Sequence, residues 1–464
     1  MSTHLLLIGL GRIGCRLAQN IRDSGYGLVA WDMCAQARVR ARREGIDVRD
    51  TLESALAAVP PPRAVLLCLP AGDPVESMLE RLRPQLVAGD VLADLGNSHF
   101  DDTARRVAAF EARGISVLGV GIAGGESGAR YGAAVMAGGS REAWKRLSPV
   151  LRDVAARVDG RPAAAFTGPA GAGHLAKVAH NAAEYAEMEA IAEVWSFMER
   201  LLDLGPEEIA RAFEGWNRAE GGCYLLEITS TILRRDDFAS GRPALEMLAD
   251  VAEHTGTGRW AVAAAVDVDL AVPSLAEALF ARILSGDLKG RRARAPLWPE
   301  SRIERPEPDT ALPVLEQALL AARIAGLTQA IMLLQAVARA RGWRIDVARV
   351  LRVWRGGGIV RSPLLRRFEQ ALSHAARPGG LLAEPWLAAK LRAVVPGLRR
   401  TVAFAARAGL PVPVLAASLG FLETLHDTRL PARLVQAQRD YFGGHGVRRV
   451  DRDGRFHLDG TRIR

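Results

Sequence analysis

The chain contains very little lysine, few cysteines and no long apolar run. Its 464 residues include four lysines, at positions 145, 177, 289 and 390, against 57 arginines. Cys15, Cys34, Cys68 and Cys223 have no metal-ligand or CxxC spacing, so we expect free thiols in a reducing cytoplasm and no metal site. No apolar run approaches about 18 residues, and the start carries no basic leader or cleavage site. The sequence therefore predicts neither a membrane-spanning helix nor a secretion signal.

The net charge of +9 invites a nucleic-acid interpretation. However, the arginines are scattered along the chain, and no basic run is interleaved with aromatic residues. A cleft that binds phosphate and carboxylate groups would use part of this positive charge. We therefore expect a small acidic ligand, and no nucleic acid, as the binding partner.

Short apolar runs alternate with helical stretches over the first 170 residues. Runs typical of buried strands stand at 4–9, 27–32, 64–70, 91–96 and 115–121. Strands that alternate with helices indicate a parallel, doubly wound sheet. Beyond about residue 170 the periodicity becomes helical, and the last stretch is polar with few apolar residues. We expect an α/β domain at 1–170, a large all-α domain at 171–432 and an extended C-terminal tail at 433–464.

A glycine-rich turn follows the first predicted strand. Gly9, Gly11 and Gly14 fit GxGxxG between a strand and a helix, with Arg12 and Ile13 inside the motif. In this motif the first glycine makes the turn, the second lets the backbone approach a pyrophosphate, and the third lets helix and strand pack closely. The helix N-terminus then faces the phosphates. The turn predicts a dinucleotide site, and the alternative is a purely structural glycine turn.

Asp32 ends the second predicted strand, 23 residues after Gly9. An acid at this position accepts hydrogen bonds from the adenosine ribose 2′-hydroxyl and repels a 2′-phosphate. It is also an ordinary helix cap, and the two roles are compatible. Asp32 therefore favours NAD over NADP, although Arg38 or Arg40 would restore NADP binding if the loop folds back.

Two further glycine-rich loops follow predicted strands. Asn97 stands in the loop 94–103, and Gly124 and Gly125 stand in the loop 121–132. Loops at the carboxyl ends of parallel strands are where doubly wound sheets bind ligands. Asn97 suits a cofactor amide or a substrate hydroxyl, and the two glycines can present N–H groups to a carboxylate. Without the neighbouring motifs, both loops are simply tight turns.

Five polar side chains share one face of a helix predicted at 173–190. They are Lys177, His180, Asn181, Glu184 and Tyr185, at offsets of 3, 4, 7 and 8 from the lysine. An amine, an imidazole, an amide, a carboxyl and a phenol together cover general base, general acid and substrate hydrogen bonding. Because lysine is so rare here, its presence suggests a need for an amine that can lose its proton, which arginine cannot do. The alternative is a solvated polar face.

Longer motifs run along nearly the whole chain. In order they are DLGNSHFDDTARR, GIAGGESGARYG, GHLAKVAHNAAEY, FEGWN, LLEIT, GTGRW, FARILS, WRGGGIVRS and LPARLVQAQRDYFGGH. From about residue 5 to about 446 the chain resembles the decarboxylating 6-phosphogluconate dehydrogenases. This resemblance implies a Rossmann-like N-terminal domain, a large all-helical domain, and a tail that reaches into the partner of a homodimer. It also implies oxidative decarboxylation of 6-phosphogluconate to ribulose 5-phosphate, a reaction of the pentose phosphate pathway and of gluconate utilisation.

The resemblance also implies roles for individual residues. Lys177 is the base that takes the proton from the substrate hydroxyl on carbon 3, and Glu184 is the acid that protonates carbon 1. The implied cofactor contacts are Gly9, Gly11, Arg12, Ile13, Gly14, Asp32 and Asn97. The implied substrate contacts are Asn97, Gly124, Gly125, His180, Asn181, Tyr185, Thr257, Arg282, Arg439 and His445. Arg439 and His445 would come from the other subunit.

The cofactor end departs from the pattern of NADP-using members of the family. Asp32, Met33 and Cys34 stand where those members carry an Asn-Arg-Thr-like segment. The arginine that would pair with a 2′-phosphate is therefore missing. This departure supports NAD as the cofactor, with NADP the less favoured one.

The substrate end departs at two further positions. Ala123 replaces a serine before the two glycines, and Thr255 replaces a lysine that contacts the phosphate. The changes leave the pair Lys177–Glu184 intact but alter both ends of the pocket. The leading interpretation is a cytoplasmic, NAD-using 6-phosphogluconate dehydrogenase. The alternatives are the same mechanism on a related aldonate with a different terminal group, and a basic Rossmann-like protein that binds NAD or a partner without turnover.

Overall fold

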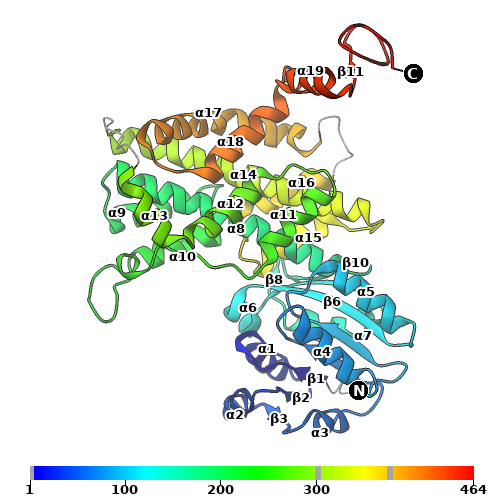
Figure 1. Cartoon of the computed structure of the whole chain (residues 1–464). Helices are drawn as coiled ribbons and strands as arrows, with labels where there is room; N and C mark the ends of the chain where they lie inside the picture. The colour runs from blue at the N-terminus through cyan, green and yellow to red at the C-terminus, as the bar shows by residue number, and fades with distance from the viewer. Residues whose placement is uncertain (1–4, 298–304, 374–379, 464) are drawn as a thin grey trace. The chain divides into compact units, whose positions relative to one another are not determined.

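A computed structural model describes residues 5–297, 305–373 and 380–463 (Figure 1). The chain divides into two compact units, Met1–Ser418 and Leu419–Arg464. The first unit contains the sheet and most of the helices, and the second contains the C-terminal segment. The domain boundaries at 170 and 432 stay predictions.

An eight-stranded sheet organises the first part of the chain, blue to cyan in Figure 1. Its order is β10-β7-β6-β5-β4-β1-β2-β3, and all neighbours pair in parallel except β6 and β7. The predicted doubly wound α/β fold is confirmed, with an antiparallel β7 added. The strands are β1 Leu5–Ile8, β2 Leu28–Trp31, β3 Asp47–Val48, β4 Ala64–Leu67, β5 Val91–Asp94, β6 Ser116–Ala123, β7 Ala134–Gly139 and β10 Ala164–Gly168.

The antiparallel pairing of β7 follows from the length of its connection. Strand β6 ends at Ala123 and β7 begins at Ala134. A parallel crossover needs about a dozen residues or more. The short helix α6, Gly125–Tyr131, therefore turns the chain back beside β6 instead of crossing over the sheet.

Two apolar layers cover the two faces of the sheet. Leu5 and Leu7 belong to one layer, with side chains of α1, α2 and α7, and Leu6 and Ile8 belong to the other, with α3, α4 and α5. Strands buried on both faces carry continuous apolar runs, which is why LLLI shows no alternation. The helices are α1 Arg12–Asp23, α2 Ala35–Arg43, α3 Leu52–Ala57, α4 Asp73–Leu82, α5 Phe100–Glu111 and α7 Arg141–Asp153.

Long helices form the rest of the first unit, as predicted. Helix α8 begins it and packs against α14, which also packs against α17. The helices are α8 Ala172–Leu201, α9 Pro206–Asn217, α10 Tyr224–Leu233, α11 Thr257–Asp267, α12 Pro273–Ser285, α13 Leu288–Arg294, α14 Pro308–Ala340, α15 Val347–Gly357, α16 Pro363–Ser373, α17 Pro385–Ala408 and α18 Pro413–His426, which runs into the second unit. Two small hairpin strands, β8 Arg157–Val158 and β9 Arg161–Pro162, precede β10.

Helix α14 is the one helix of the described chain that is long and apolar enough, by length and composition, to cross a membrane. Arg323 and Gln329 interrupt its apolar residues, so it contains no continuous run of the kind sought in the sequence. Its most apolar window has a mean hydropathy of 1.5, and 78% of that window is buried inside the protein. A buried core helix passes the same test of length and composition.

The C-terminal unit is folded, although an extended tail was expected. Helix α19, Ala432–Gly443, is followed by an antiparallel pair of short strands, β11 Val447–Arg448 and β12 Arg455–Phe456. Phe456 is buried within this unit. The expectation of an unpacked stretch was wrong because the buried ring of Phe456, the pairing of β11 with β12 and hydrogen bonds to Asp440 fold it.

Candidate active site

The glycine-rich turn after β1 has the geometry of a dinucleotide loop. Gly9 has a φ of +103°, and a Cβ there would lie 2.3 Å from the carbonyl oxygen of Cys68. A Cβ on Gly14 would lie 2.1 Å from the carbonyl oxygen of Gly9. Gly11 precedes the first residue of α1, and a Cβ there would meet no atom of the described residues within 4 Å. Backbone contacts thus require two of the glycines, while open space at the helix N-terminus suits a phosphate group.

Arg12 and Ile13, which follow Gly11 in the motif, differ in their surroundings. Arg12 is exposed and forms an ion pair with Glu126 at 2.6 Å. Ile13 packs against the apolar layer that lies over α1. Arg12 is therefore accessible to a ligand, and Ile13 mainly holds the helix in place.

Asp32 connects the glycine-rich turn to the turn after β2. Its Oδ2 accepts a hydrogen bond from the N–H of Leu10 at 2.6 Å, and its Oδ1 accepts one from the N–H of Cys34 at 2.7 Å. Each carboxylate oxygen has a second lone pair, so binding a ribose hydroxyl is compatible with these contacts. The side chain of Met33 is 80% exposed beside it.

Arg38 and Arg40 of α2 fold back over this turn. Arg38 Nη1 donates to the carbonyl oxygens of Asp32 at 2.7 Å and Met33 at 3.1 Å, and Arg40 Nη2 donates to that of Leu10 at 3.3 Å. Two positive charges therefore stand next to the carboxylate that was predicted to repel a 2′-phosphate. Both guanidinium groups are already bound to backbone carbonyl oxygens of this turn, and the preference for NAD over NADP stays a prediction.

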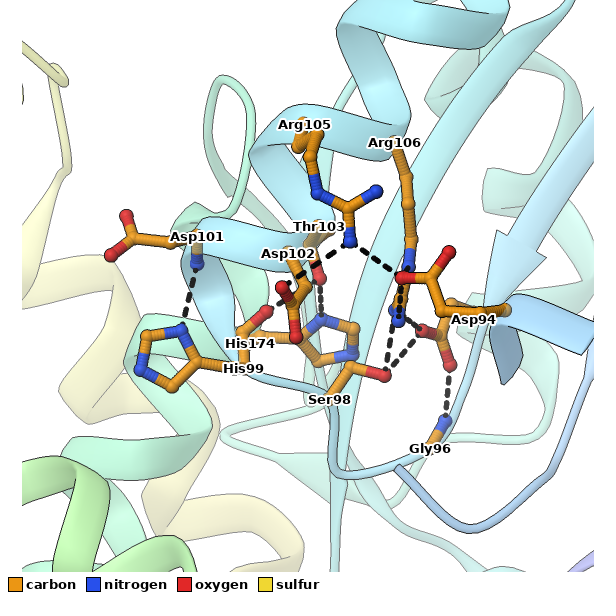
Figure 2. Close-up of polar contacts among 11 residues, drawn as sticks. Asp94, Gly96, Ser98, His99, Asp101, Asp102, Thr103, Arg105, Arg106 and His174 are labelled. Atoms are coloured by element: carbon orange, nitrogen blue, oxygen red, sulfur yellow. Dashed lines mark hydrogen bonds and ion pairs between the residues drawn. The ribbon is translucent and has the colours of Figure 1, made fainter. Parts of the chain in front are cut away.

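A buried polar network holds the loop that carries Asn97 (Figure 2). Asp94, at the end of β5, accepts hydrogen bonds from Gly96 N at 3.0 Å and Ser98 Oγ at 2.6 Å. Arg106 of α5 donates from Nη1 to Asp94 Oδ2 and to Ser98 Oγ, both at 3.0 Å. Asp94, Ser98 and Arg106 are buried, whereas Asn97 is exposed. The network fixes both sides of a loop whose tip faces outward.

Removing Arg106 should destabilise the protein far more than removing its neighbour Arg105. Arg106→Met leaves Asp94 buried and unpaired, and breaking a buried pair in this way costs about 3–5 kcal/mol. Arg105 pairs with Glu76 and Asp102 at a side-chain exposure of 59%, so Arg105→Met should cost about 1 kcal/mol or less. The free energy of unfolding in urea, measured for both variants, checks this. Equal losses would contradict the role assigned to burial.

His174 links the same network to α8. Its Nδ1 lies 2.7 Å from Thr103 Oγ1 of α5, and the ring is buried (Figure 2). Burial lowers the pKa of His174, partly opposed by the charge of Asp94. The neutral ring therefore joins the Asn97 loop to the first turn of the helix that carries Lys177.

Glycines bring α8 directly onto the sheet. A Cβ on Gly173 would lie 2.3 Å from the carbonyl oxygen of Gly119, and a Cβ on Gly121 would lie 2.5 Å from Lys177 Cβ. Side chains at these positions would push the helix away from β6. Because the glycines allow the close approach, Lys177 lies against the second half of β6, just before the loop with Gly124 and Gly125.

The five polar residues of α8 lie on one helix, as the spacing predicted, and most are buried. Lys177 is 8% exposed, His180 0%, Asn181 8% and Tyr185 5%. The side chain of Glu184 is 21% exposed. The alternative of a solvated polar face is therefore wrong.

Hydrogen bonds order the middle of this face. His180 Nδ1 lies 3.1 Å from Asn181 Oδ1, and Asn181 Nδ2 donates to Thr257 Oγ1 at 3.1 Å. The His180 ring meets the Trp354 ring edge-on, with centroids 5.5 Å apart. Its Nε2 has no hydrogen-bond partner in the described ranges of the chain. A buried polar atom without a partner costs free energy, so this nitrogen is suited to a ligand hydroxyl.

Burial shifts the ionisable groups of this face in directions that suit acid–base chemistry. Desolvation lowers the pKa of Lys177, opposed by the charge of Glu184. Desolvation also raises the pKa of Glu184, opposed by Lys177 and Arg282. Burial lowers the pKa of His180 well below its ordinary value, so this ring is neutral. The shifts move the amine of Lys177 toward its neutral form and the carboxyl of Glu184 toward its protonated form, the directions that a base and an acid at one site require.

Tyr185, Thr257 and Arg282 meet at one end of this face. The guanidinium carbon of Arg282 lies 3.6 Å from the centroid of the Tyr185 ring, and Arg282 Nη1 donates to the carbonyl oxygen of Glu253 at 3.3 Å. Thr257 begins α11 and is buried. Thr255, two residues earlier, is exposed. A positive charge, a hydroxyl and an aromatic ring therefore stand together where a terminal anion was expected.

The predicted carboxylate contacts, Gly124 and Gly125, lie in the loop after β6, whereas Arg439 and His445 lie in the C-terminal unit. Gly124 has a φ of +126°, and a Cβ there would lie 2.8 Å from the carbonyl oxygen of Gly357, whereas Gly125 has open space beside it. Arg439 and His445 belong to the second unit. Their place in a substrate site stays a prediction.

Several residues that support the site were not predicted from the sequence. Arg106 and Ser98 lie in a motif from which only Asn97 was singled out, and His174 stands one turn before Lys177. Their residue types alone do not predict a role in the site, because whether an arginine is buried and which residues it pairs with become known only from the structure. The four cysteines are free thiols, and the described residues contain no group of three or more His, Cys, Asp or Glu that could hold a metal ion.

Comparison with known families covers nearly the whole chain. Residues 4–162 match the NAD binding domain of 6-phosphogluconate dehydrogenase, and residues 173–460 match the 6-phosphogluconate dehydrogenase C-terminal domain. Residues 163–172, which contain β10 and the first residue of α8, lie between the two matches. The second match spans both the predicted all-α domain at 171–432 and most of the predicted tail at 433–464.

Individual relatives agree with these matches. A decarboxylating 6-phosphogluconate dehydrogenase of Saccharomyces cerevisiae is 37% identical over 97% of this chain and 93% of the relative. An NAD(+)-dependent, decarboxylating 6-phosphogluconate dehydrogenase of Bacillus subtilis is 35% identical over 99% of both chains. The solved 6-phosphogluconate dehydrogenase of Plasmodium falciparum, studied with NADP+ and with 6-phosphogluconate, superposes with a TM-score of 0.93 at 29% identity, covering 98% of this chain and 99% of that chain. The chain therefore belongs to the 6-phosphogluconate dehydrogenase family.

Proposed function

We propose that this protein catalyses the oxidative decarboxylation of 6-phosphogluconate to ribulose 5-phosphate and carbon dioxide, with reduction of a nicotinamide cofactor. The observation that carries the proposal is the buried face of α8, on which the pKa of Lys177 is lowered and that of Glu184 is raised. Membership of the family supports the substrate, and the face supports turnover rather than binding alone. We also propose the cytoplasm as the compartment.

The residues of the first domain fit a dinucleotide. The open space beside Gly11 at the start of α1 accepts the pyrophosphate, and Asp32 lies where it can accept the ribose hydroxyls. We assign Asn97, which is exposed at the tip of its loop, to contacts with the nicotinamide end of the cofactor. When bound, the nicotinamide accepts a hydride from carbon 3 of the substrate.

Lys177 moves the proton of the substrate hydroxyl. As a neutral amine it takes this proton from the oxygen on carbon 3 while the carbon–hydrogen bond is broken, which produces a 3-keto acid. The carbon–carboxylate bond then breaks, carbon dioxide leaves, and its electron pair moves to the ketone. Lys177, now an ammonium group, returns its proton to the oxygen that becomes the enol. The buried amine is suited to both steps because desolvation lowers its pKa and so makes the proton easier to lose.

Glu184 completes the reaction at carbon 1 of ribulose 5-phosphate, which was carbon 2 of 6-phosphogluconate. The enediol left by decarboxylation must gain a proton at that carbon to become ribulose 5-phosphate. Burial raises the pKa of the Glu184 carboxyl and so favours the protonated form that donates here, and the carboxylate regains a proton from solvent afterwards. The proton of the enol hydroxyl returns to Lys177, so the lysine is charged when product forms and loses that proton before the next turnover.

We propose that the remaining polar residues bind the sugar acid. His180 and Asn181 hold hydroxyls of the substrate, and Gly124 and Gly125 present N–H groups to its carboxylate. Tyr185, Thr257 and Arg282 hold the terminal phosphate, where a charge-assisted contact to arginine is strong. Arg439 and His445 complete this end from the partner subunit of a homodimer.

We expect NAD to be the preferred cofactor by about tenfold in kcat/KM, equivalent to about 1.4 kcal/mol. Asp32 faces the 2′-position, and Met33 cannot pair with a phosphate, so a 2′-phosphate meets a repulsive group. Measuring kcat/KM with NAD and NADP tests this. A preference for NADP in the wild type would overturn the expectation. Arg38→Gln and Arg40→Gln would then identify the rescuing arginine by a selective loss of NADP activity.

Thr255→Lys is expected to lower the KM for 6-phosphogluconate. A charge-assisted hydrogen bond contributes about 1.5–3 kcal/mol, which corresponds to about a tenfold to hundredfold gain in affinity. Thr310→Lys, an exposed change on the first turn of α14, is the matched control for added charge. If Thr255→Lys leaves KM unaltered or raises it, the pocket for the terminal group differs from that of relatives with lysine at this position, and the related-aldonate alternative is favoured.

A coupled assay tests the function itself. Formation of NADH and release of carbon dioxide are followed with 6-phosphogluconate and with a small panel of aldonates that differ at the terminal group. Equal amounts of both products from 6-phosphogluconate are expected. Because Ala123 and Thr255 alter the pocket, a higher kcat/KM for another aldonate would establish the same mechanism on that substrate instead. No product from any aldonate would overturn the proposal.

A further inference from the structure

One carboxylate joins three segments of the C-terminal unit. Asp440 lies near the end of α19 and is only 6% exposed. Its Oδ1 accepts a hydrogen bond from Gly446 N at 2.6 Å and lies 2.9 Å from His457 Nδ1, and its Oδ2 accepts one from Leu458 N at 2.8 Å. Asp440 thereby connects the helix end, the turn that follows it and the segment after β12.

Further contacts support the same arrangement. Gln436 Nε2 donates to the carbonyl oxygen of Gly446 at 2.7 Å, and Arg455 Nη2 donates to that of His445 at 2.6 Å. Val447 pairs with Phe456 across the two short strands. The turn that contains His445 is therefore held from the helix on one side and from the hairpin on the other.

His457 is the one side chain among these three donors to Asp440. The hydrogen bond from His457 comes first among the causes that lower the pKa of Asp440, followed by the N–H groups of Leu458 and Gly446. The carboxylate is therefore ionised, and hydrogen bonds to an ionised acceptor are the stronger kind. A substitution cannot remove the backbone donors, but it can remove the imidazole.

His445 is the last residue with a role in the proposed function, and residues 447–463 have no role in it. Arg439 directly precedes Asp440, and its Nη1 donates to Gln436 Oε1 at 3.2 Å. His445 directly precedes Gly446, whose N–H is bound by Asp440. The two residues proposed to reach the partner's substrate are therefore adjacent in sequence to this contact. Arg439 is next to Asp440 itself, and His445 is next to Gly446, whose N–H donates to Asp440.

We infer that His457, acting through Asp440, is a positioning residue that holds Arg439 and His445 in the geometry for binding substrate in the partner subunit. The inference rests on the proposed function, in which these two residues contact 6-phosphogluconate. It gives the last residues of the chain a role in substrate affinity, although they do not touch the substrate themselves.

The test compares His457→Leu with His457→Asn. Leucine removes the donor, whereas the amide nitrogen of asparagine stands in for Nδ1 of the ring. His457→Leu is expected to raise the KM for 6-phosphogluconate by about tenfold or more, as for loss of one hydrogen bond to a charged group. It should change kcat less and leave the Kd for NAD unaltered. His457→Asn should restore most of the affinity.

Asp451→Asn is the matched control. Asp451 is exposed in the same C-terminal segment and pairs with Arg449 at 2.8 Å, without contacting Asp440. Its substitution should leave KM unchanged. Hydrogen exchange of peptides covering 440–458 should be faster in His457→Leu than in the wild type and Asp451→Asn, because the N–H groups of Gly446 and Leu458 lose an ordered acceptor.

The outcomes separate this inference from the proposed function. Arg439→Ala and His445→Ala are measured in the same assay. If they raise KM and His457→Leu does not, the inference is overturned and the proposed function stands. Unchanged exchange in His457→Leu, or an asparagine variant as weak as the leucine variant, also overturns it. If the wild type does not turn over 6-phosphogluconate, the proposed function fails first and the inference fails with it.

Discussion

Lys177→Met is expected to lower kcat for 6-phosphogluconate by about 10⁴-fold, the upper end of what general acid–base catalysis contributes. The loss is large because one amine serves as the base in oxidation and as the acid in decarboxylation. Methionine nearly fills the volume of the buried lysine, so folding and the binding of both ligands should persist. Steady-state kinetics together with cofactor and substrate binding check this. Turnover within about tenfold of the wild type would remove Lys177 from the role.

Lys177→Arg is the matched control for charge. Arginine keeps the positive charge but cannot lose its proton, so this variant should be as inactive as Lys177→Met. The pH profile adds a second readout. Activity requires a neutral Lys177 and so falls as pH drops below its lowered pKa, and it requires a protonated Glu184 and so falls as pH rises above its raised pKa. Glu184→Gln should remove the limb at high pH.

Deleting residues 430–464 should abolish activity, because the deletion removes Arg439 and His445 from the partner's site. The N-terminal domain should still bind NAD, since the glycine-rich turn and Asp32 are untouched. Titration of the cofactor and an activity assay of the truncated protein test the two statements. An active, monomeric truncation would contradict the proposal that the sites are shared between subunits.

Mixed dimers make this prediction sharper. Lys177→Met has an intact C-terminal unit, and the truncated chain has an intact α8 face. If the sites are shared, a dimer of one chain of each kind contains one complete site, so mixing two inactive proteins should restore activity. Lys177→Met mixed with Lys177→Arg is the matched control. Both chains then lack the base on their own α8 helix, so no complete site forms and no activity should return.

The α8 face was predictable from the sequence because its spacing is a local property. Residues at offsets of three, four, seven and eight share one side of any α-helix, whatever surrounds it. The glycine-rich turn was predictable for a similar reason. The contacts of Gly9 and Gly14 lie within a strand, a turn and a helix that are consecutive in the chain, apart from the neighbouring strand that supplies Cys68.

The burial of Lys177 was not predictable in the same way. It depends on Gly121 and Gly173, which let α8 approach β6, and these residues meet only after the sheet has formed. The desolvation that lowers the lysine pKa is a consequence of that approach. Sequence spacing could place the amine beside a carboxyl, but it could not distinguish a buried face from a solvated one.

The sequence alone determined the alternating α/β pattern, the dinucleotide turn and the set of side chains on α8, because each depends on residues a few positions apart. The tertiary structure decided how these parts act. It placed Arg38 and Arg40 beside Asp32 and paired Arg106 with Asp94. It also placed His457 in contact with Asp440, 17 residues earlier in the chain. The residue types alone do not predict that these particular residues contact one another. The strength of these contacts depends on burial, which the packing of the whole fold sets.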